Sequence, residues 1–192
     1  MIVFDGEMGG IGIDKSLLTM YFMIIDECKS KVDELYLYLK PKDGIYKVEA
    51  RALEINHINL IDHDKIAITY DEGGTLLYNF INKHSNNGAI KLIPLGHGCS
   101  GDLDHIFDKL LRRPNWEKFI SYRRLDTQVV VQFLKETGHI PDTVSGGLDS
   151  LVEYFGIKID GPLHDSKTDT LATYEVFKQL KNIVPKFSGG AC

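Results

Sequence analysis

Three apolar, strand-forming segments at the start of the chain constrain its fold more than any other feature. Residues 1–7, 17–25 and 31–39 are rich in the aliphatic and aromatic side chains that favour strands, and a polar turn separates the second from the third. The first segment ends in carboxylates. Together the three segments predict a meander of three strands.

Helical and strand patterns alternate along the rest of the chain. Ser100 is expected to cap one helix, and Gly138 and Gly156 are expected to end two others. A meander followed by this alternation predicts an α/β protein with a mixed central sheet covered by helices. The expected helices cover residues 49–55, 75–83, 100–111, 127–136, 148–155 and 166–183, and the expected strands cover residues 89–95 and 120–125.

Length and apolar content favour one compact unit. The chain has 192 residues, of which 43% are hydrophobic, so it can bury one sizeable core. We expect one domain over residues 1–187 and a frayed tail at residues 188–192. The apolar runs are shorter than the roughly 20 residues that a membrane span needs, and no charged-then-apolar leader opens the chain. These features predict a soluble protein, cytoplasmic or otherwise intracellular, with no membrane contact.

Cysteine content and net charge exclude two further classes. The three cysteines are widely spaced and form no CxxC pair, so they predict neither a disulfide framework nor a zinc site. The net charge of -5 argues against a protein that coats nucleic acid by charge alone, since phosphate binding draws on Lys and Arg. A nuclease stays possible because carboxylates gathered around divalent metal make a chain acidic.

Two carboxylates, Asp5 and Glu7, end the first apolar segment. Residues two apart in a strand point to the same face, so both side chains project together from the strand end. Two acids in this arrangement repel each other unless a cation lies between them. The alternative is a pair of solvated charges, which the apolar run in front of them disfavours.

A second acid follows the expected strand at residues 89–95. The sequence Gly-His-Gly-Cys-Ser-Gly separates that strand from Asp102, which falls in the first turn of the next helix. Small residues between a strand and a helix leave room for a ligand. The helix dipole alone also favours a carboxylate at this position, and Asp104 is a close alternative to Asp102.

The last expected helix carries Asp169 on its apolar face. Ala172, Val176 and Leu180 follow it at helical spacing, so the carboxylate is expected to point inward and to need a partner. His164 lies one loop earlier and can reach over whatever Asp169 binds. The alternative for this histidine is a solvated loop residue.

Together these residues predict a metal-dependent hydrolase site. Divalent cations such as Mg²⁺ and Mn²⁺ prefer carboxylate oxygens, and two of them can activate a water and stabilise a leaving oxygen in phosphodiester hydrolysis. A histidine that titrates near neutral pH can accept the proton of that water.

The ordered motifs resemble those of the DEDDh (DnaQ-like) 3′-to-5′ exonuclease superfamily over nearly the whole chain. The sequences FDGEM, GHGCSGD and HDSKTDTLAT are similar to its three motifs, and EARALEINHI, LDT and LDSLVEYFGI to its intervening segments. The resemblance implies a ribonuclease H-like fold and two divalent ions, Mg²⁺ or Mn²⁺. It also implies that Asp5, Glu7, Asp102 and Asp169 are metal ligands and that His164 is the general base.

The chain departs from the family pattern at positions near the substrate. The family often has a threonine around the first two acids, where this chain has Gly6, Met8 and Gly9, and an asparagine where Gly98 follows His97. Met8, Gly9 and His97 are therefore the expected substrate-binding positions. The departures affect which nucleic acid is cut and leave the metal ligands intact.

These observations predict an exonuclease that releases nucleoside 5′-monophosphates from the 3′ ends of single-stranded DNA or RNA. One alternative is a proofreading subunit that acts in a polymerase complex, and a homodimer is also compatible with the sequence. A second alternative is a catalytically silent nucleic-acid-binding protein, and a third is a phosphatase of small nucleotides. The sequence leaves the choice between DNA and RNA open, because the 2′-hydroxyl is read by local contacts.

Overall fold

The predicted meander forms one side of the central sheet. The computed structural model describes residues 1–26, 28 and 30–183, so the predicted tail at residues 188–192 lies outside the described residues. Strands β1 (Ile2–Met8), β2 (Leu17–Ile25) and β3 (Lys31–Lys40) pair antiparallel in chain order. Every residue of β2 is buried, as expected for the central strand of a sheet covered on both faces.

Three short strands complete a mixed sheet. Strand β5 (Pro94–Gly96) pairs parallel with β1, β6 (Leu125–Asp126) pairs parallel with β5, and β4 (Ile68–Thr69) pairs parallel with β3. Within the described residues the strand order is β4-β3-β2-β1-β5-β6. The predicted mixed sheet is therefore confirmed. Because β1 and β5 are parallel, the carboxyl end of β1, with Glu7, and the segment that follows β5, with Asp102, lie at the same edge of the sheet.

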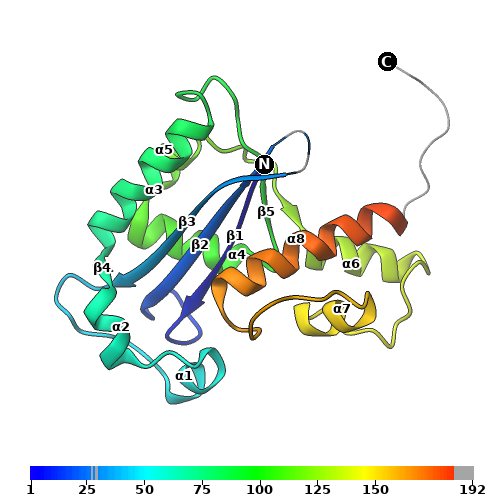
Figure 1. Cartoon of the computed structure of the whole chain (residues 1–192), viewed down its shortest axis with the longest axis horizontal. Coiled ribbons are helices and arrows are strands. Elements are labelled where there is room, and N and C mark those ends of the chain that lie inside the picture. The colour runs from blue at the N-terminus through cyan, green and yellow to red at the C-terminus, as the bar shows by residue number, and fades with distance from the viewer. Residues whose placement is uncertain (27, 29, 184–192) are drawn as a thin grey trace.

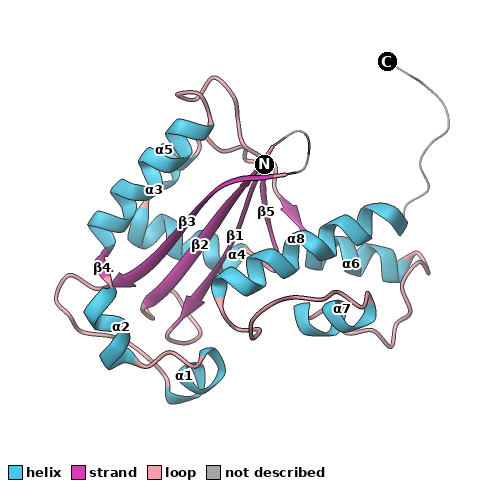
Figure 2. Cartoon of the chain, viewed as in Figure 1, coloured by secondary structure: helices cyan, strands magenta, loops and turns pink. Residues whose placement is uncertain are grey.

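Helices cover both faces of this sheet (Figures 1 and 2). On one face, Ile2 and Phe4 of β1 pack with apolar residues of α3, α4, η1 and α5. On the other face, Val3 of β1 packs with Tyr174 of α8, and α6 and α7 pack against α8. The helices are α1 (Ala50–Asn56), α2 (Leu60–Ile66), α3 (Tyr70–His84), α4 (Ser100–His105), η1 (Ile106–Leu110), α5 (Arg113–Trp116), α6 (Thr127–Glu136), α7 (Leu148–Tyr154) and α8 (Ser166–Ile183).

Two predicted strands are much shorter in the structure. The strand expected at residues 89–95 is reduced to β5, because Asn86, Asn87 and Gly88 have positive φ and form a turn ahead of it. The strand expected at 120–125 is reduced to β6, and only an isolated bridge from Leu92 to Ile120 extends the pairing.

The helix predicted at residues 75–83 begins earlier, at Tyr70. Thr69 and Glu72 form a capping box at its start. Gly73 and Gly74 lie inside this helix, where a Cβ on Gly74 would meet the Leu110 carbonyl oxygen at 2.2 Å. The glycine pair therefore permits a close helix crossing and does not end a loop.

Other helix boundaries also differ. Cys99, and not Ser100, is the N-cap of α4, and its side chain makes no capping hydrogen bond. The single helix expected at residues 100–111 changes to a π-helical turn at Ile106, and α2 and α5 were not predicted. The other predicted helices agree with the structure to within a residue or two. No helix in the described part of the chain has the length and apolar character to cross a bilayer.

Candidate metal centre

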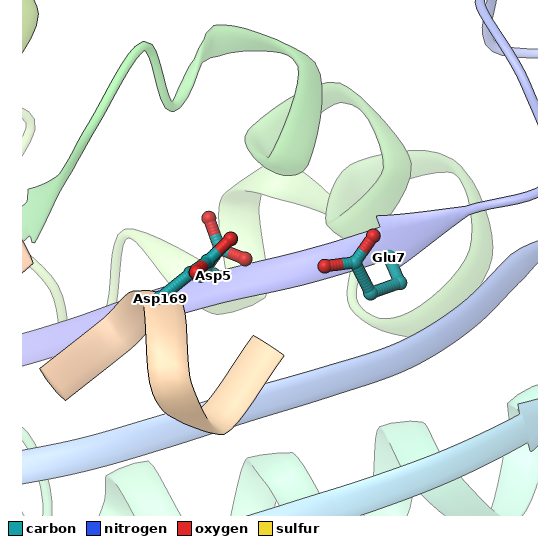
Figure 3. A group of neighbouring side chains, drawn as sticks. All are labelled: Asp5, Glu7 and Asp169. Carbon is teal, nitrogen blue, oxygen red and sulfur yellow. The ribbon is translucent and has the colours of Figure 1, made fainter. Parts of the chain in front are cut away.

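Strand β1 directs two acids toward helix α8. Alternate residues of the strand face opposite sides, so Val3, Asp5 and Glu7 share the α8 face. Asp169 comes from the first turn of α8. Ligand oxygens of Asp5, Glu7 and Asp169 all lie within 4.8 Å of one another (Figure 3). The structure thus brings together three of the four acids that the sequence singled out.

The local electrostatics favour a bound cation at this cluster. Burial raises the pKa of Asp5 well above its usual value, and the charges of Asp102, Asp169 and Glu7 raise it further. Burial and neighbouring acids raise the pKa of Glu7 to about 8, and burial raises that of Asp169 to about 6. Burial, with repulsion between neighbouring acids added to it, therefore disfavours the ionised carboxylates here. A divalent cation with oxygen ligands would remove that repulsion, so the residues fit a metal.

Asp102 approaches from the other face of β1. It lies in the first turn of α4, is 8% exposed, and accepts a hydrogen bond from the backbone N–H of Gly6. Burial raises its pKa to about 7. A Cβ on Gly6 would lie 3.3 Å from Asp102 Oδ1 and 2.3 Å from Met20 Sδ, so only glycine leaves this approach free. Asp104, the alternative ligand, is exposed.

The loop before α8 presents His164 beside the acids. The histidine is exposed and has a left-handed backbone with φ of 66°. Its backbone N–H donates to both oxygens of Asp169, at 3.3 and 3.2 Å. The next residue, Asp165, accepts hydrogen bonds from two backbone N–H groups in the first turn of α8 and from Tyr36 Oη at 2.8 Å. These bonds tie the histidine loop to both α8 and β3.

A cleft of about 290 Å³ opens next to these groups. Glu7 and His164 line one end, and Thr19, Tyr36 and Tyr38 form its floor on the sheet. The rings of Tyr36 and Tyr38 stack with their centroids 4.5 Å apart. The far wall comes from α1, α2 and the turn between them, with Asn56, His57, Ile58, Asn59, Asp62, His63 and Ile66.

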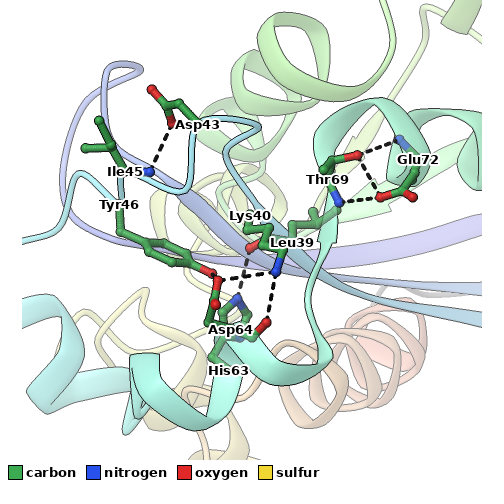
Figure 4. A network of polar contacts seen from close by, with 9 residues as sticks. All are labelled: Leu39, Lys40, Asp43, Ile45, Tyr46, His63, Asp64, Thr69 and Glu72. Carbon is green, nitrogen blue, oxygen red and sulfur yellow. Dashed lines mark hydrogen bonds and ion pairs between the residues drawn. The ribbon is translucent and has the colours of Figure 1, made fainter.

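Hydrogen bonds hold this far wall against β3 (Figure 4). The buried ring of His63 lies with Nε2 2.9 Å from the Leu39 carbonyl oxygen. Lys40 Nζ donates to the carbonyl oxygen of Asp64 at 3.0 Å, and Tyr46 Oη donates to its carboxylate at 3.0 Å. The prediction from the sequence gave His63 no role and did not include Tyr36 or Tyr38. Tyr36 and Tyr38 share one face of β3, and only the packing of β3 on β2 and α2 places them beside the cleft.

The three expected substrate positions lie elsewhere. Met8 packs against the core, and its carbonyl accepts a hydrogen bond from Asn56 at 3.3 Å. Gly9 is buried, and a Cβ there would meet the Lys47 carbonyl oxygen at 2.7 Å. His97 is half-buried, and its Nδ1 lies 2.8 Å from Thr127 Oγ1. None of the three lines the cleft beside Glu7 and His164.

A further buried acid, Asp126, supports the approach of Asp102. Its carboxylate accepts hydrogen bonds from the backbone N–H groups of Gly98 at 2.9 Å, Cys99 at 3.2 Å and Gln128 at 3.0 Å. The first two fix the loop ahead of α4, and the third caps α6. The signal for this residue was an aspartate directly before a predicted helix, which is a preferred N-cap.

Comparison with known structures agrees with this architecture. E. coli exonuclease I in complex with a dT13 oligonucleotide matches 94% of this chain with a TM-score of 0.70 and 18% identity. Its zinc-bound form with single-stranded DNA gives 0.71 and 18%, and exonuclease I from Methylocaldum szegediense gives 0.70 and 15%. This chain spans 40% of the length of each. No protein-family model and no curated protein sequence matches it. The chain has the ribonuclease H-like α/β fold of exonuclease I, as predicted.

Proposed function

We propose that this chain is a metal-dependent 3′-to-5′ exonuclease that releases nucleoside 5′-monophosphates from single-stranded nucleic acid. One observation carries the proposal: ligand oxygens of Asp5, Glu7 and Asp169 lie within 4.8 Å of one another beside a cleft. The fold shared with exonuclease I, which has been captured with oligonucleotides, supports the choice of substrate.

The proposed ligands are Asp5, Glu7 and Asp169, with Asp102 completing the set beside Asp5. Two bound Mg²⁺ or Mn²⁺ ions supply an activated water and neutralise the phosphate in this class of chemistry. The residues of this chain would hold the two ions in place. Gly6 lets Asp102 approach the strand, because a side chain at residue 6 would occupy its path.

His164 is the proposed general base. It is exposed at the end of the cleft that Glu7 lines, so it can accept the proton of the attacking water at a ring nitrogen. The hydrogen bond from its backbone to Asp169 fixes the loop relative to the metal ligands. The bond from Tyr36 to Asp165 fixes the same loop relative to the cleft floor.

Digestion of labelled polymers tests the proposal. Single-stranded DNA and RNA of matching sequence, labelled at the 5′ end, are incubated with Mg²⁺, Mn²⁺ or EDTA. The wild-type protein should produce a ladder that shortens from the 3′ end, and EDTA or Asp169→Ala should abolish it. Asp71→Ala is the matched control, because its carboxylate is 82% exposed on α3. Full activity of Asp169→Ala would refute the ligand assignment.

The histidine needs a separate variant. His164→Ala should lower the rate by roughly a hundredfold, as expected for loss of a general base, while metal-induced thermal stabilisation persists. Loss of that stabilisation would make His164 a metal ligand instead. If the wild-type protein binds both polymers and cuts neither with any metal, the chain is either a subunit that needs a polymerase partner or a silent binding protein.

A further inference from the structure

A cationic segment lies outside the proposed metal site. Residues 112–124 hold five of the 22 Lys and Arg residues and only one acid, in a chain whose net charge is -5. The segment includes α5 and the loop to β6, and it lies on the sheet face opposite α8, because Trp116 packs with Phe4. Concentrated positive charge on an acidic protein favours a polyanionic partner.

Tyr122 stands between two hollows in this segment. A cleft of about 360 Å³ is lined by Arg113 and Arg124, and a second hollow of about 470 Å³ is lined by Lys91 and Arg123. Tyr122 lines both, and it is 77% exposed. An exposed aromatic ring flanked by cations is the arrangement that single-stranded nucleic acid uses, with bases on the ring and phosphates on the cations.

The cations of these hollows differ in how far their charge is already used: Glu117 lines both hollows, and Lys91 Nζ donates to the carbonyl oxygens of Glu117 and Lys118. Arg113 pairs with Glu117 at 3.3 Å, and both side chains are largely exposed. Arg123 lies over the Tyr122 ring at 5.4 Å, and Arg124 donates to the Ser100 hydroxyl at 3.1 Å. Neither Arg123 nor Arg124 forms an ion pair with an acid in the described part of the chain. Both guanidinium groups are therefore free to bind phosphate.

Helix α4 links this surface to the metal site. Arg124 contacts Ser100 in the first turn of α4, and Asp102, which approaches β1 at Gly6, lies two residues further along that helix. At a rise of about 1.5 Å per residue, the two positions are separated by less than one helical turn. Arg124 is therefore tied to the same short helix that carries Asp102.

We propose that the surface formed by Arg113, Tyr122, Arg123 and Arg124, here called the arginine surface, binds the sugar–phosphate backbone and a base of the single strand upstream of the nucleotide being removed. This inference rests on the proposed exonuclease function for its substrate. It predicts that the arginine surface contributes to binding of long strands and does not contribute to hydrolysis of short ones.

Fluorescence anisotropy with labelled oligothymidylates, measured in EDTA over a range of NaCl concentrations, tests the arginine surface. The double variant Arg123→Gln/Arg124→Gln should bind a strand of about 20 nucleotides roughly tenfold more weakly than wild type. The slope of log K against log salt should become shallower by about 1.4, because each lost contact to a single strand removes about 0.7. Tyr122→Ala should weaken binding by a similar factor and leave the slope unchanged, because stacking releases no counterions.

Two controls make the result specific. The first control is Lys42→Gln/Lys83→Gln, which removes two positive charges outside the arginine surface from side chains that are 85% and 68% exposed. It should change neither the affinity for the long strand nor the salt slope. Hydrolysis of a trinucleotide should have the same kcat/KM in the arginine variant and in wild type. An equal loss on the trinucleotide would place the arginines in the active site and overturn the proposal.

Three further results would overturn, reassign or support the arginine surface. Unchanged affinity and slope for the long strand in the arginine variant would overturn the proposal outright. Competition by polyglutamate as strong as by unlabelled strand would assign the surface to an acidic protein partner instead. A wild-type protein that cuts no polymer, while the arginine variant still loses affinity and slope, would refute a free-standing exonuclease and support the arginine surface.

Discussion

Replacing Asp169 with asparagine should stabilise the metal-free protein and remove its response to divalent metal. Asp169 is 9% exposed, and its pKa is raised to about 6 from an ordinary 3.8. This raised pKa corresponds to about 3 kcal/mol of unfavourable burial of the Asp169 charge at pH 8. Asparagine keeps an acceptor for the His164 N–H but loses the charge assistance, which costs about 1 kcal/mol. The net gain is about 2 kcal/mol, or about 4–8 °C in Tm.

The gain should depend on pH in one direction. The pKa of Asp169 in the folded protein lies above its value in the unfolded chain, so the folded state holds the proton more tightly. Asp169 therefore contributes a loss of stability to the wild-type protein as pH rises from about 4 to about 6, and the asparagine variant lacks that contribution. The stability advantage of the variant should be full at pH 8 and smaller by at least half at pH 5.

Thermal unfolding in EDTA at pH 8 and pH 5, repeated at pH 8 with Mg²⁺ or Mn²⁺, measures both effects. Metal at a hundredfold excess over its Kd should stabilise the wild-type protein by about 3 kcal/mol and the variant by far less. Asp71→Asn controls for loss of an exposed carboxylate. A variant that is less stable than wild type at pH 8 in EDTA would contradict the charge-burial account of Asp169, and one that keeps the full metal response would contradict its role as a ligand.

Three further variants probe how the site is held. Gly6→Ala should lower the free energy of unfolding by about 1–3 kcal/mol and remove most of the activity, because the alanine Cβ would lie 2.3 Å from Met20 Sδ. Urea unfolding measures the first loss, and the digestion assay measures the second. Asp126→Ala should lower unfolding free energy by about 3 kcal/mol in urea, because three backbone N–H groups lose their acceptor. Tyr36→Phe should lower kcat several-fold with KM nearly unchanged, because it frees Asp165 from β3; equal kcat in steady-state assays would exclude that role.

The sequence predicted those features that depend on local pattern. Runs of apolar, strand-forming residues marked β1, β2 and β3, and the stripe that continues from Asp169 marked α8 over the same residues that the structure shows. The acids at the ends of these elements could be found because each stands beside an apolar run. Parallel pairing of β1 with β5 then brings the carboxyl ends of these strands together, so acids that are far apart in the sequence lie near one another.

Features that depend on distant contacts could not be predicted in this way. Gly73 and Gly74 look like a loop signal in the sequence, but Gly74 lies against the backbone of Leu110 and Gly73 against the side chain of Leu39. The lengths of β5 and β6 depend on how much of each segment reaches a neighbour, and the residues themselves favour longer strands. The floor of the cleft comes from Tyr36 and Tyr38, whose role follows from the register of β3 on β2.

Gly6 shows how a departure from a family pattern can have a packing cause. Asp5 and Glu7 use one face of β1 to meet Asp169, and the residue between them must use the other face. On that face Met20 fills the space, and Asp102 takes the remaining room to accept the Gly6 N–H. A larger residue 6 would require the Met20 side chain to move or the Asp102 carboxylate to shift away from β1. Residue 6 therefore packs against both Met20 and Asp102, and this packing favours glycine independently of any contact with substrate.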